Sequence, residues 1–440
     1  MEFFLRFVSS RNPNSSEVSF SEALLNCMPD DGGMYVPKVN ENLSNWILYM
    51  NGQTSFQSIA GTLTSALIKD EFSPIICENI ATKAFPFSPK LKQLDDNLFS
   101  LELFHGPTGC HKDFAISYFA SCLENILIMK DKYVTILAVT NGVTGACIAE
   151  ALKNKTRLKA ILLYTKDNLK KIDKDSLVEN GGNILQIEID GSEEQCFEVV
   201  RQLLKDEDFS SKYNLTLANS INIGRVLPMI FPYIYAFTRL KNQVYGDIFY
   251  SMEAGNYGNL VAGLYGWNAS LPVNGFITNC TESLLLDRKN KCTILDSVIP
   301  LENRKAVDPG NPSNLERLES VFNANDLMIK GLVFPSIITE KDKVEAGKSA
   351  YKKYGYILDE QTSIAYAATL KQSETILDQD GSVVLVAKNH PGLTSSEIKH
   401  RIGKTVDLPD SIKKMQEKAI QNKIITPNCE IIKNHIKNFF

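Results

Sequence analysis

This sequence has no long apolar run and no marked excess of charge of one sign. No stretch approaches the ~18 consecutive apolar residues that a membrane-spanning helix needs, so we expect no membrane span. The 47 basic and 51 acidic side chains leave a net charge of −4, which gives no basic field that would attract nucleic acid. An early acid, Glu2, and the short apolar run around it argue against a signal peptide. We therefore expect a cytoplasmic protein whose partners include neither nucleic acid nor a membrane.

Histidine is scarce, and cysteine forms no recognisable motif. The chain has five histidines, none of them paired at metal-ligand spacing, so we expect no metal site. Its nine cysteines include no Cys-x-x-Cys pair, and an odd number in a chain of this length argues against a disulfide framework. We interpret them as small buried residues of a protein kept in a reducing compartment.

The remaining composition is ordinary for a folded protein. Hydrophobic residues make up 44% and charged residues 22% of the 440 residues. At about 150 residues per domain, this length allows two or three domains. We expect a leading region at residues 1–95, a central region at 96–400 and a C-terminal helical tail at 401–440. In the leading region, residues 54–67 have helical spacing, and Ser19 or Ser21 is positioned to cap another helix.

Strand and helix patterns alternate through the central region. Five apolar runs predict strands, at residues 133–139, 158–164, 183–189, 247–251 and 382–387. Helical patterns follow several of them, at residues 146–153, at 193–204 and from about 260. Strands that alternate with helices favour an α/β protein built on parallel sheets.

Two loops after predicted strands carry glycine, and ligands gather at the carboxyl ends of strands in α/β sheets. In residues 253–259, Gly255 and Gly258 let backbone N–H groups approach an anion such as phosphate. A tight turn from strand to helix explains these glycines equally well. Residues 140–145 offer hydroxyl and amide donors in the same setting, as many such turns do.

A third segment, residues 105–114, reads His-Gly-Pro-Thr-Gly-Cys-His-Lys-Asp-Phe. It places Lys112 beside an acid and after a Gly-Pro-Thr turn. A lysine amine can attack the aldehyde of a cofactor such as pyridoxal phosphate. By residue type alone, an ordinary surface lysine explains Lys112 as readily.

This segment resembles the cofactor-lysine motif of the threonine synthases. Residues 218–225 resemble the Asn-Ser-Ile-Asn segment of that family, and 389–391 stand where the family has Ala-His-Pro. The segments that resemble the family, in chain order, are residues 18–23, 31–37, 105–114, 140–145, 218–225, 255–259, 389–391 and 406–409. Their common order over nearly the whole chain is more specific than any single motif.

The resemblance implies a fold and a reaction. The fold is the two-lobed, parallel-sheet type II fold of pyridoxal phosphate enzymes, with a small N-terminal domain. The reaction converts O-phosphohomoserine and water to threonine and phosphate, so the partner is a small phosphorylated amino acid. A monomer and a homodimer both remain open.

The resemblance also implies roles for particular residues. Lys112 would hold the cofactor and act as general base. The cofactor phosphate would lie on the loop formed by Gly255, Asn256, Tyr257, Gly258 and Asn259. The substrate contacts would come from Asn141, Thr144, Asn219 and Arg225. Arginine suits phosphate because its guanidinium is a rigid two-pronged donor, although a surface salt bridge is the alternative role for Arg225.

The sequence departs from the family pattern around the cofactor. Val143 replaces an acid and Asn141 a serine in the loop at 140–145. Lys388 stands where the family has a hydroxyl residue facing the pyridine nitrogen, and a cation there opposes protonation of that nitrogen. His111 replaces an aromatic residue before the lysine, and Glu360-Gln361 replaces Pro-His.

Two alternatives follow from these departures. One is a related lyase or dehydratase that acts on another hydroxy-amino acid, with or without a phosphate, which the substitutions at Asn141 and Val143 would favour. The other is a catalytically degenerate relative that serves as a binding protein, which Val143 and Lys388 would favour. The presence of Lys112 favours an enzyme over the second alternative.

Overall fold

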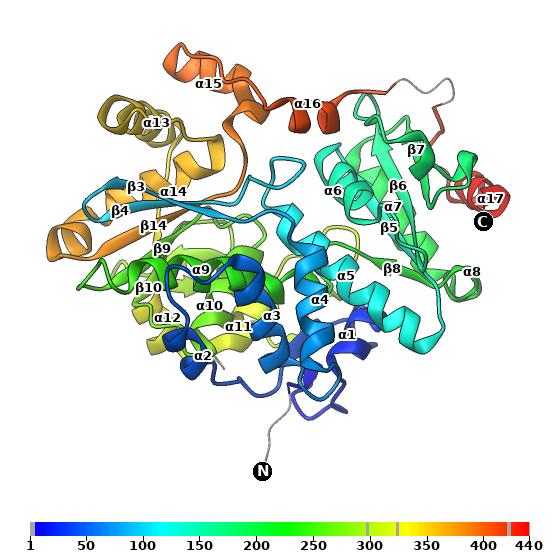
Figure 1. Ribbon diagram of the computed structural model, residues 1–440, viewed down its shortest axis with the longest axis horizontal. Coiled ribbons are helices and arrows are strands. Elements are labelled where there is room, and N and C mark those ends of the chain that lie inside the picture. Colours follow the sequence, from blue (N-terminus) through cyan, green and yellow to red (C-terminus); the bar gives the residue numbers. More distant parts are fainter. Residues whose placement is uncertain (1–4, 296–298, 323–324, 420–423, 440) are drawn as a thin grey trace.

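Two separate sheets organise the chain, and each carries one lobe (Figure 1). The computed structural model describes residues 5–295, 299–322, 325–419 and 424–439. The larger sheet has six strands and the smaller sheet has four. This arrangement confirms the predicted α/β fold with two lobes on parallel sheets.

The six-stranded sheet forms the core of the larger lobe. In spatial order its strands are β13 (Val333–Ser336), β10 (Gly275–Asn279), β9 (Ile248–Ser251), β14 (Ser382–Ala387), β4 (Leu98–Glu102) and β3 (Lys90–Asp95). All neighbours pair in parallel except β3, which runs antiparallel to β4. Both faces are covered, so β14 is buried along its whole length.

Helices pack on both faces of this sheet. Val383 and Leu385 of β14 join a core with residues of α13 (Glu340–Tyr354) and α14 (Glu360–Lys371). Val384 and Val386 face the opposite core, to which α9 (Ile230–Leu240) and α10 (Gly258–Asn268) contribute. Between β10 and β13 the chain adds β11 (Leu284–Leu286), β12 (Cys292–Ile294), α11 (Leu315–Phe322) and α12 (Asp326–Leu332).

The four-stranded sheet is entirely parallel and forms the core of the smaller lobe. Its order is β7 (Ile184–Ile189), β6 (Leu158–Thr165), β5 (Val134–Thr140) and β8 (Leu215–Leu217). One face packs on α7 (Glu193–Lys205), beside α8 (Glu207–Tyr213), and the other on α5 (Lys112–Lys130) and α6 (Val143–Ala151). Helix α6 begins three residues before the predicted start at 146, because Gly142, at φ 118°, turns the chain directly out of β5 into the helix.

The leading residues pack on the large lobe and on α5. They form the antiparallel pair β1 (Phe7–Ser9) and β2 (Tyr35–Pro37) and the helices α1 (Phe20–Asn26), α2 (Ser44–Tyr49), α3 (Phe56–Leu67) and α4 (Pro74–Ala84). Ser19 caps α1 in a capping box with Glu22, as its position in the sequence predicted. Phe56 of α3 packs edge-on against Phe114 of α5, which ties the leading helices to the segment that holds Lys112.

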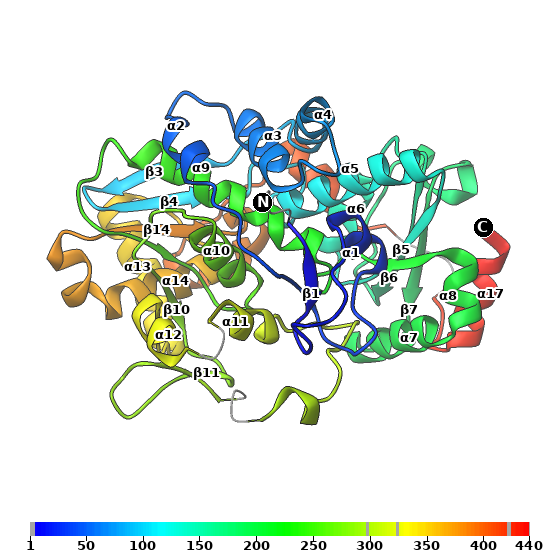
Figure 2. The same cartoon turned by 90° about the horizontal axis from the view of Figure 1, so that it is seen from below.

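The C-terminal residues cross from one lobe to the other. Helices α15 (Ser395–Ile402) and α16 (Asp410–Gln416) follow the large sheet, and Lys418 then bridges to Lys170 of the small lobe. Ile425 pairs with Ile189, the last residue of β7, and α17 (Cys429–Phe439) packs on α7. Figure 2 shows α17 at the outer edge of the small lobe, near α7 and α8. In the part of the chain that is described, no helix is both long and apolar enough to span a membrane.

Candidate active site

The loops that follow β5 and β9 line one pocket with the segment around Lys112. The cavity has a volume of about 240 Å³. Because β5 belongs to the small sheet and β9 to the large one, the pocket lies between the lobes. Every predicted cofactor or substrate residue except Gly255 and Tyr257 lines it, namely Lys112, Asn141, Thr144, Asn219, Arg225, Asn256, Gly258 and Asn259.

Lys112 is the first residue of α5, and its amine lies against the first turn of α6. The Nζ atom donates a hydrogen bond of 2.9 Å to Oγ1 of Thr144. Asp113 holds the preceding turn against α5, because its carboxylate accepts hydrogen bonds from the N–H and the hydroxyl of Thr108. A Cβ atom at Gly106 would lie 2.5 Å from Oδ2 of Asp113, so this close approach requires glycine. These contacts orient Lys112 into the pocket.

Asp113 is buried, and its environment favours the neutral acid. Burial is the largest effect and raises the pKa of Asp113 to about 7, with the neighbouring Cys110 acting in the same direction. The hydrogen bonds from Thr108 oppose the shift without cancelling it. The residue beside Lys112 therefore anchors the turn through its hydrogen bonds with Thr108.

The loop between β9 and α10 has the geometry of an anion site. The first N–H groups of a helix have no partner inside the helix and attract phosphate. Tyr257 precedes α10 in the left-handed region at φ 65°, which is strained for a bulky residue. Its buried ring does not line the pocket, and its hydroxyl lies 2.5 Å from Oγ1 of Thr281. Tyr257 thus shapes the loop, while Asn256, Gly258 and Asn259 face the pocket.

Lys388 is buried at the end of β14 and holds the start of this loop. Its Nζ atom donates to the backbone oxygen of Glu253 at 2.8 Å and to the Glu253 carboxylate at 2.7 Å. The other carboxylate oxygen accepts from the N–H of Gly255 at 2.9 Å. Burial by itself would raise the pKa of Glu253, but the Lys388 ammonium and the Gly255 N–H outweigh it and lower the pKa. The charge of Lys388 is therefore compensated in place.

We expect Lys388→Met to weaken the binding of pyridoxal phosphate by about tenfold, because it leaves the half-buried Glu253 carboxylate without its cationic partner and loosens the loop. Titration of cofactor fluorescence measures the dissociation constant. The double variant Lys388→Met with Glu253→Gln should bind more tightly than the single variant, since it removes the unpaired charge. Equal affinities of the single variant and the unaltered protein for the cofactor would contradict the role of Lys388 in holding this loop through Glu253.

The other departures from the family pattern also have local roles. Val143 is the first residue of α6 and packs against the core, while the hydroxyl of Thr140 shapes the loop by accepting from the N–H groups of Gly142 and Gly145. The amide of Gln361 accepts a hydrogen bond of 2.9 Å from Asn389, next to Lys388. Gln361 and Lys388, two of the substituted positions, are thus close to each other, because Gln361 contacts the residue that follows Lys388.

Arg225 brings an incompletely satisfied cation to the pocket. Its Nη1 atom donates to the backbone oxygen of Ala218, whereas the buried Nε atom has no hydrogen-bond partner among the described residues. Burial lowers the pKa of Arg225 to about 10, so the side chain stays charged at neutral pH. Asn219 lies beside it, with its amide donating to the backbone oxygen of Pro309 at 2.7 Å. Because Arg225 lines the pocket, its guanidinium is placed near an anion bound there.

One wall of the pocket was not anticipated from the sequence. Gly310, Asn311 and Pro312 line it, from a loop that precedes α11. Asp308 holds this loop by accepting from the N–H of Gly310 at 2.8 Å and pairing with Arg201 of α7. The run Asp-Pro-Gly-Asn-Pro at 308–312 signals a turn, but nothing local signals that it meets the loop of β9.

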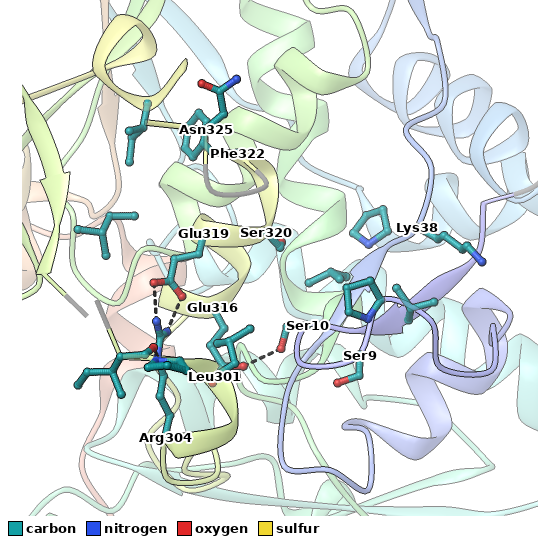
Figure 3. A pocket seen from close by; sticks show the side chains of 18 of the residues that line it. Ser9, Ser10, Lys38, Leu301, Arg304, Glu316, Glu319, Ser320, Phe322 and Asn325 are labelled. Carbon is teal, nitrogen blue, oxygen red and sulfur yellow. Dashed lines mark hydrogen bonds and ion pairs between the residues drawn. The ribbon is translucent and has the colours of Figure 1, made fainter. Parts of the chain in front are cut away.

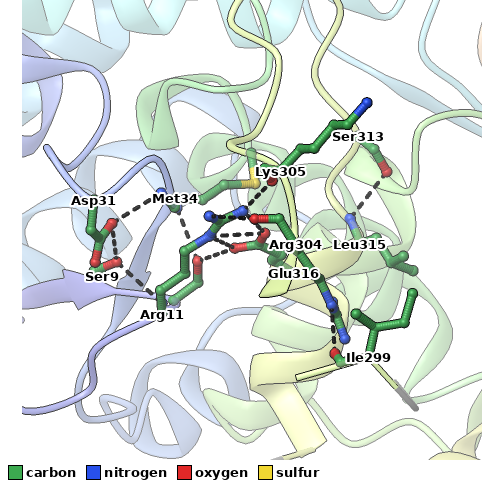
Figure 4. Close-up of polar contacts among 12 residues, drawn as sticks. Ser9, Arg11, Asp31, Met34, Ile299, Arg304, Lys305, Ser313, Leu315 and Glu316 are labelled. Carbon is green, nitrogen blue, oxygen red and sulfur yellow. Dashed lines mark hydrogen bonds and ion pairs between the residues drawn. The ribbon is translucent and has the colours of Figure 1, made fainter. Parts of the chain in front are cut away.

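A larger cavity lies elsewhere, and its charged groups are less suited to catalysis. It has a volume of about 550 Å³ and lies between the leading strands and α11 and α12 (Figure 3). Its charged groups already pair with neighbouring ones, as Arg304 does with Glu319 at 2.5 Å. Glu316 accepts from Ser10 at 2.6 Å (Figure 3) and from Arg11 at 2.7 Å (Figure 4). The smaller pocket, with Lys112, is therefore the candidate active site.

The residues of this pocket fit pyridoxal phosphate. Lys112 supplies a partly buried amine for its aldehyde, the first turn of α10 beyond Gly258 supplies N–H groups for its phosphate, and the guanidinium of Arg225 lies in the same pocket for a further anion. Across the described ranges, no three His, Cys, Asp or Glu side chains are grouped to hold a metal ion.

Comparison with known proteins gives relatives over nearly the whole chain. Residues 6–85 match the family model described as the threonine synthase N terminus. The threonine synthase of Escherichia coli is 28% identical, with 92% of each chain covered, and that of Haemophilus influenzae is 29% identical, with 90% of this chain and 92% of that one covered.

Solved structures give the same result for the fold. The crystal structure of threonine synthase from Escherichia coli matches with a TM-score of 0.79 and 26% identity, covering 99% of this chain and all of that one. The structure of pyridoxal-phosphate-bound threonine synthase from Brucella melitensis matches with a TM-score of 0.81 at 21% identity, covering 99% of both chains, and supports the fold alone. In sequence and in fold, this chain is similar to the threonine synthases.

Proposed function

We propose that this protein is a pyridoxal-phosphate-dependent threonine synthase, which converts O-phosphohomoserine and water to threonine and phosphate. The observation that carries the proposal is the position of Lys112. Its amine lies in one pocket with a helix-initiating loop suited to phosphate and with the cationic side chain of Arg225. A reaction between a phosphate-bearing cofactor and a phosphate-bearing substrate requires an amine and two anion sites together.

The chain's own residues divide the work as follows. When bound, pyridoxal phosphate supplies an electron sink that stabilises negative charge on the substrate carbons. Lys112 would hold the cofactor through its amine and move protons at those carbons as general base. The hydroxyl of Thr144, 2.9 Å from Nζ, would keep the amine oriented. In the overall reaction the bond from the γ-carbon to the phosphate oxygen breaks, and the water oxygen bonds to the β-carbon.

Arg225, Asn219 and Asn141 are proposed to bind the anionic groups of the substrate. We expect Arg225→Ala to raise KM for O-phosphohomoserine by about 10- to 100-fold, because the variant loses charge-assisted hydrogen bonds to an anionic group of the substrate. Steady-state phosphate release measures it, with Arg288→Ala on the exposed surface as the matched control. An unchanged KM would assign Arg225 a structural role through its bond to Ala218.

The direct test is product stoichiometry. Incubation of the cofactor-loaded protein with O-phosphohomoserine should release phosphate and threonine in equal amounts. A keto acid in place of threonine would identify a related lyase or dehydratase instead. No product from protein that carries the cofactor would overturn the proposal and favour a binding protein.

We further propose that the enzyme works in the cytoplasm, as a monomer or a homodimer. All nine cysteines are free thiols, which is consistent with a reducing compartment.

A further inference from the structure

A third cavity, outside the candidate active site, is lined by an excess of lysines. It has a volume of about 420 Å³ and lies between the small lobe and the C-terminal segment, where α16 contacts α6 (Figure 1). Three acids line it against five lysines, namely Lys153, Lys170, Lys171, Lys174 and Lys414. The whole chain has a net charge of −4, so this concentration of positive charge is local. The proposed reaction uses none of these lysines.

Ion pairs within the cavity neutralise only part of this charge. Lys153 pairs with Asp173 at 3.0 Å, and Lys171 pairs with Glu417 at 3.1 Å. The third acid, Glu150, adds to the negative field around Lys153. The other lysines form no ion pair with any residue that the structure describes, namely Lys170, Lys174 and Lys414. The cavity therefore holds more positive charge than its own carboxylates balance.

Lys170 lies where the small lobe and the C-terminal segment pair with each other. Its Nζ atom donates to the backbone oxygen of Gln416 at 3.2 Å. Its backbone bridges to that of Lys418, and the N–H of Lys171 donates to the oxygen of Glu417 at 2.8 Å. Burial lowers the pKa of Lys170, and the charge of Lys418 adds to this effect. An anion beside Lys170 would stabilise its ammonium and offset the repulsion from Lys418.

The other residues of the cavity indicate the kind of anion. Lysine ammonium groups bind phosphate as point charges, and three of them suit a group with several negative charges. Four side chains add an apolar part to the lining, namely Ala146, Ala149, Ile172 and Met415. The volume lies within the range of roughly 300–1,000 Å³ that is usual for sites of small organic ligands. An organic molecule with a polyphosphate group meets both requirements.

We propose that this cavity binds a small organic polyphosphate, of the class of the nucleoside triphosphates, and that the bound ligand fixes α16 on the small lobe. The polyphosphate would lie among Lys170, Lys174 and Lys414. Lys414 belongs to α16, whereas Lys170 and Lys174 follow β6 in the small lobe. One anion that contacts lysines of both segments holds the segments together, because it attracts both.

Contacts from the cavity lead to the candidate active site. Gly142, which precedes α6, lies against Lys170, since a Cβ atom there would be 2.5 Å from Cε of that lysine. The side chain of Gln416 donates to the backbone oxygen of Thr108 at 3.2 Å, in the turn before Lys112. A ligand that fixes Lys170 and α16 would therefore steady both segments. Binding in the cavity does not depend on the reaction proposed for Lys112.

Calorimetric titration of the cofactor-loaded protein with ATP tests the site. We expect saturable binding at about 0.15 M salt, where exposed charges are largely screened. Lys174→Ala with Lys414→Ala should weaken this binding by about tenfold or more, because it removes two cations of the site, and both lysines are exposed, so the fold should persist. Lys352→Ala with Lys353→Ala is the matched control. It removes two exposed lysines of α13 that do not line the cavity, and should leave the affinity unchanged.

Two further measurements test the class of ligand and its effect on α16. Inorganic tripolyphosphate should bind more weakly than ATP, and equal affinities would overturn the organic part of the assignment. Bound ATP should slow the hydrogen exchange of backbone amides in residues 412–419, as expected for a segment that the ligand holds in place. Saturable binding with unchanged exchange in these residues would overturn the proposed fixing of α16.

The phosphate-binding groups of the candidate active site offer ATP another place to bind. ATP binding that Arg225→Ala abolishes, and that Lys174→Ala with Lys414→Ala leaves unchanged, would place ATP in that pocket and overturn the proposal. The absence of saturable binding to the unaltered protein would overturn it as well. Protein that binds ATP through the lysines and makes no threonine would refute the proposed function alone.

Discussion

Lys112→Ala should lower kcat by about 10³-fold or more, because it removes the amine that would hold the cofactor and move the substrate protons. Phosphate release from O-phosphohomoserine measures the loss. The same variant should lose the cofactor's covalent attachment. Borohydride treatment should fix pyridoxal phosphate to the peptide containing Lys112 in the unaltered protein and to no peptide of the variant.

The matched control for this prediction lies on the same helix. Lys130 is in the last turn of α5, is exposed and is remote from the pocket. Lys130→Ala should keep both the attachment and the activity. Borohydride labelling of a lysine other than Lys112 in the unaltered protein would refute the assignment of the cofactor lysine.

Arg317→Met should lower the free energy of unfolding by about 3–5 kcal/mol, the largest effect that we expect on stability. Arg317, on α11, is fully buried, and its guanidinium donates to backbone oxygens of Tyr35, Ser220 and Ile221 and to the side chain of Asn314. Burial lowers its pKa to about 10, so it remains charged at neutral pH. Methionine fills the space but leaves these acceptors without donors. Urea denaturation followed by circular dichroism measures the change.

The same arginine also supports the pocket. Ser220 accepts hydrogen bonds from Asn256 of the β9 loop and from Asn314, both at 2.9 Å. Two hydrogen bonds therefore connect Arg317 with Asn256 of the candidate site, one on each side of Ser220. Arg288→Met, on the exposed surface, is the control and should change the stability by less than about 0.5 kcal/mol. Similar urea midpoints for the two variants would show that the buried network contributes little.

The strands that the sequence predicted are those with both faces covered by apolar neighbours. Ser382–Ala387 and Leu158–Thr165 have continuous or nearly continuous apolar runs because helices cover both sides of their sheets. The strand Leu98–Glu102 was missed, although it lies inside the large sheet, since Ser100 and Glu102 break the pattern. Both are satisfied by the hydroxyl of Tyr356, at 3.0 and 2.8 Å, which no local pattern could indicate.

The candidate site likewise has parts that could be predicted from the sequence and parts that could not. The loops at 140–145 and 253–259 could be found from the sequence, because a βα loop places its residues at the carboxyl edge of a sheet whatever the rest of the fold does. Lys112 could be singled out only through the resemblance of residues 105–114 to the family motif. The wall at 310–312 could not, because it reaches the pocket through contacts with distant Asn219 and Asn256. The sequence also could not show that Gly255 and Tyr257 of the predicted phosphate loop shape the loop without lining the pocket.

From the sequence alone we could predict the α/β class, five of the ten strands in the two main sheets, a candidate cofactor lysine and the family resemblance. Hydrophobic periodicity and turn chemistry act over a few residues, so a linear pattern is enough to read them. How the buried charges are compensated depends on the tertiary structure. Lys388 and Glu253 are 135 residues apart, and Arg317 and Tyr35 are 282 apart. A buried polar group must find its partner wherever the fold places one, and that position is a property of the folded chain.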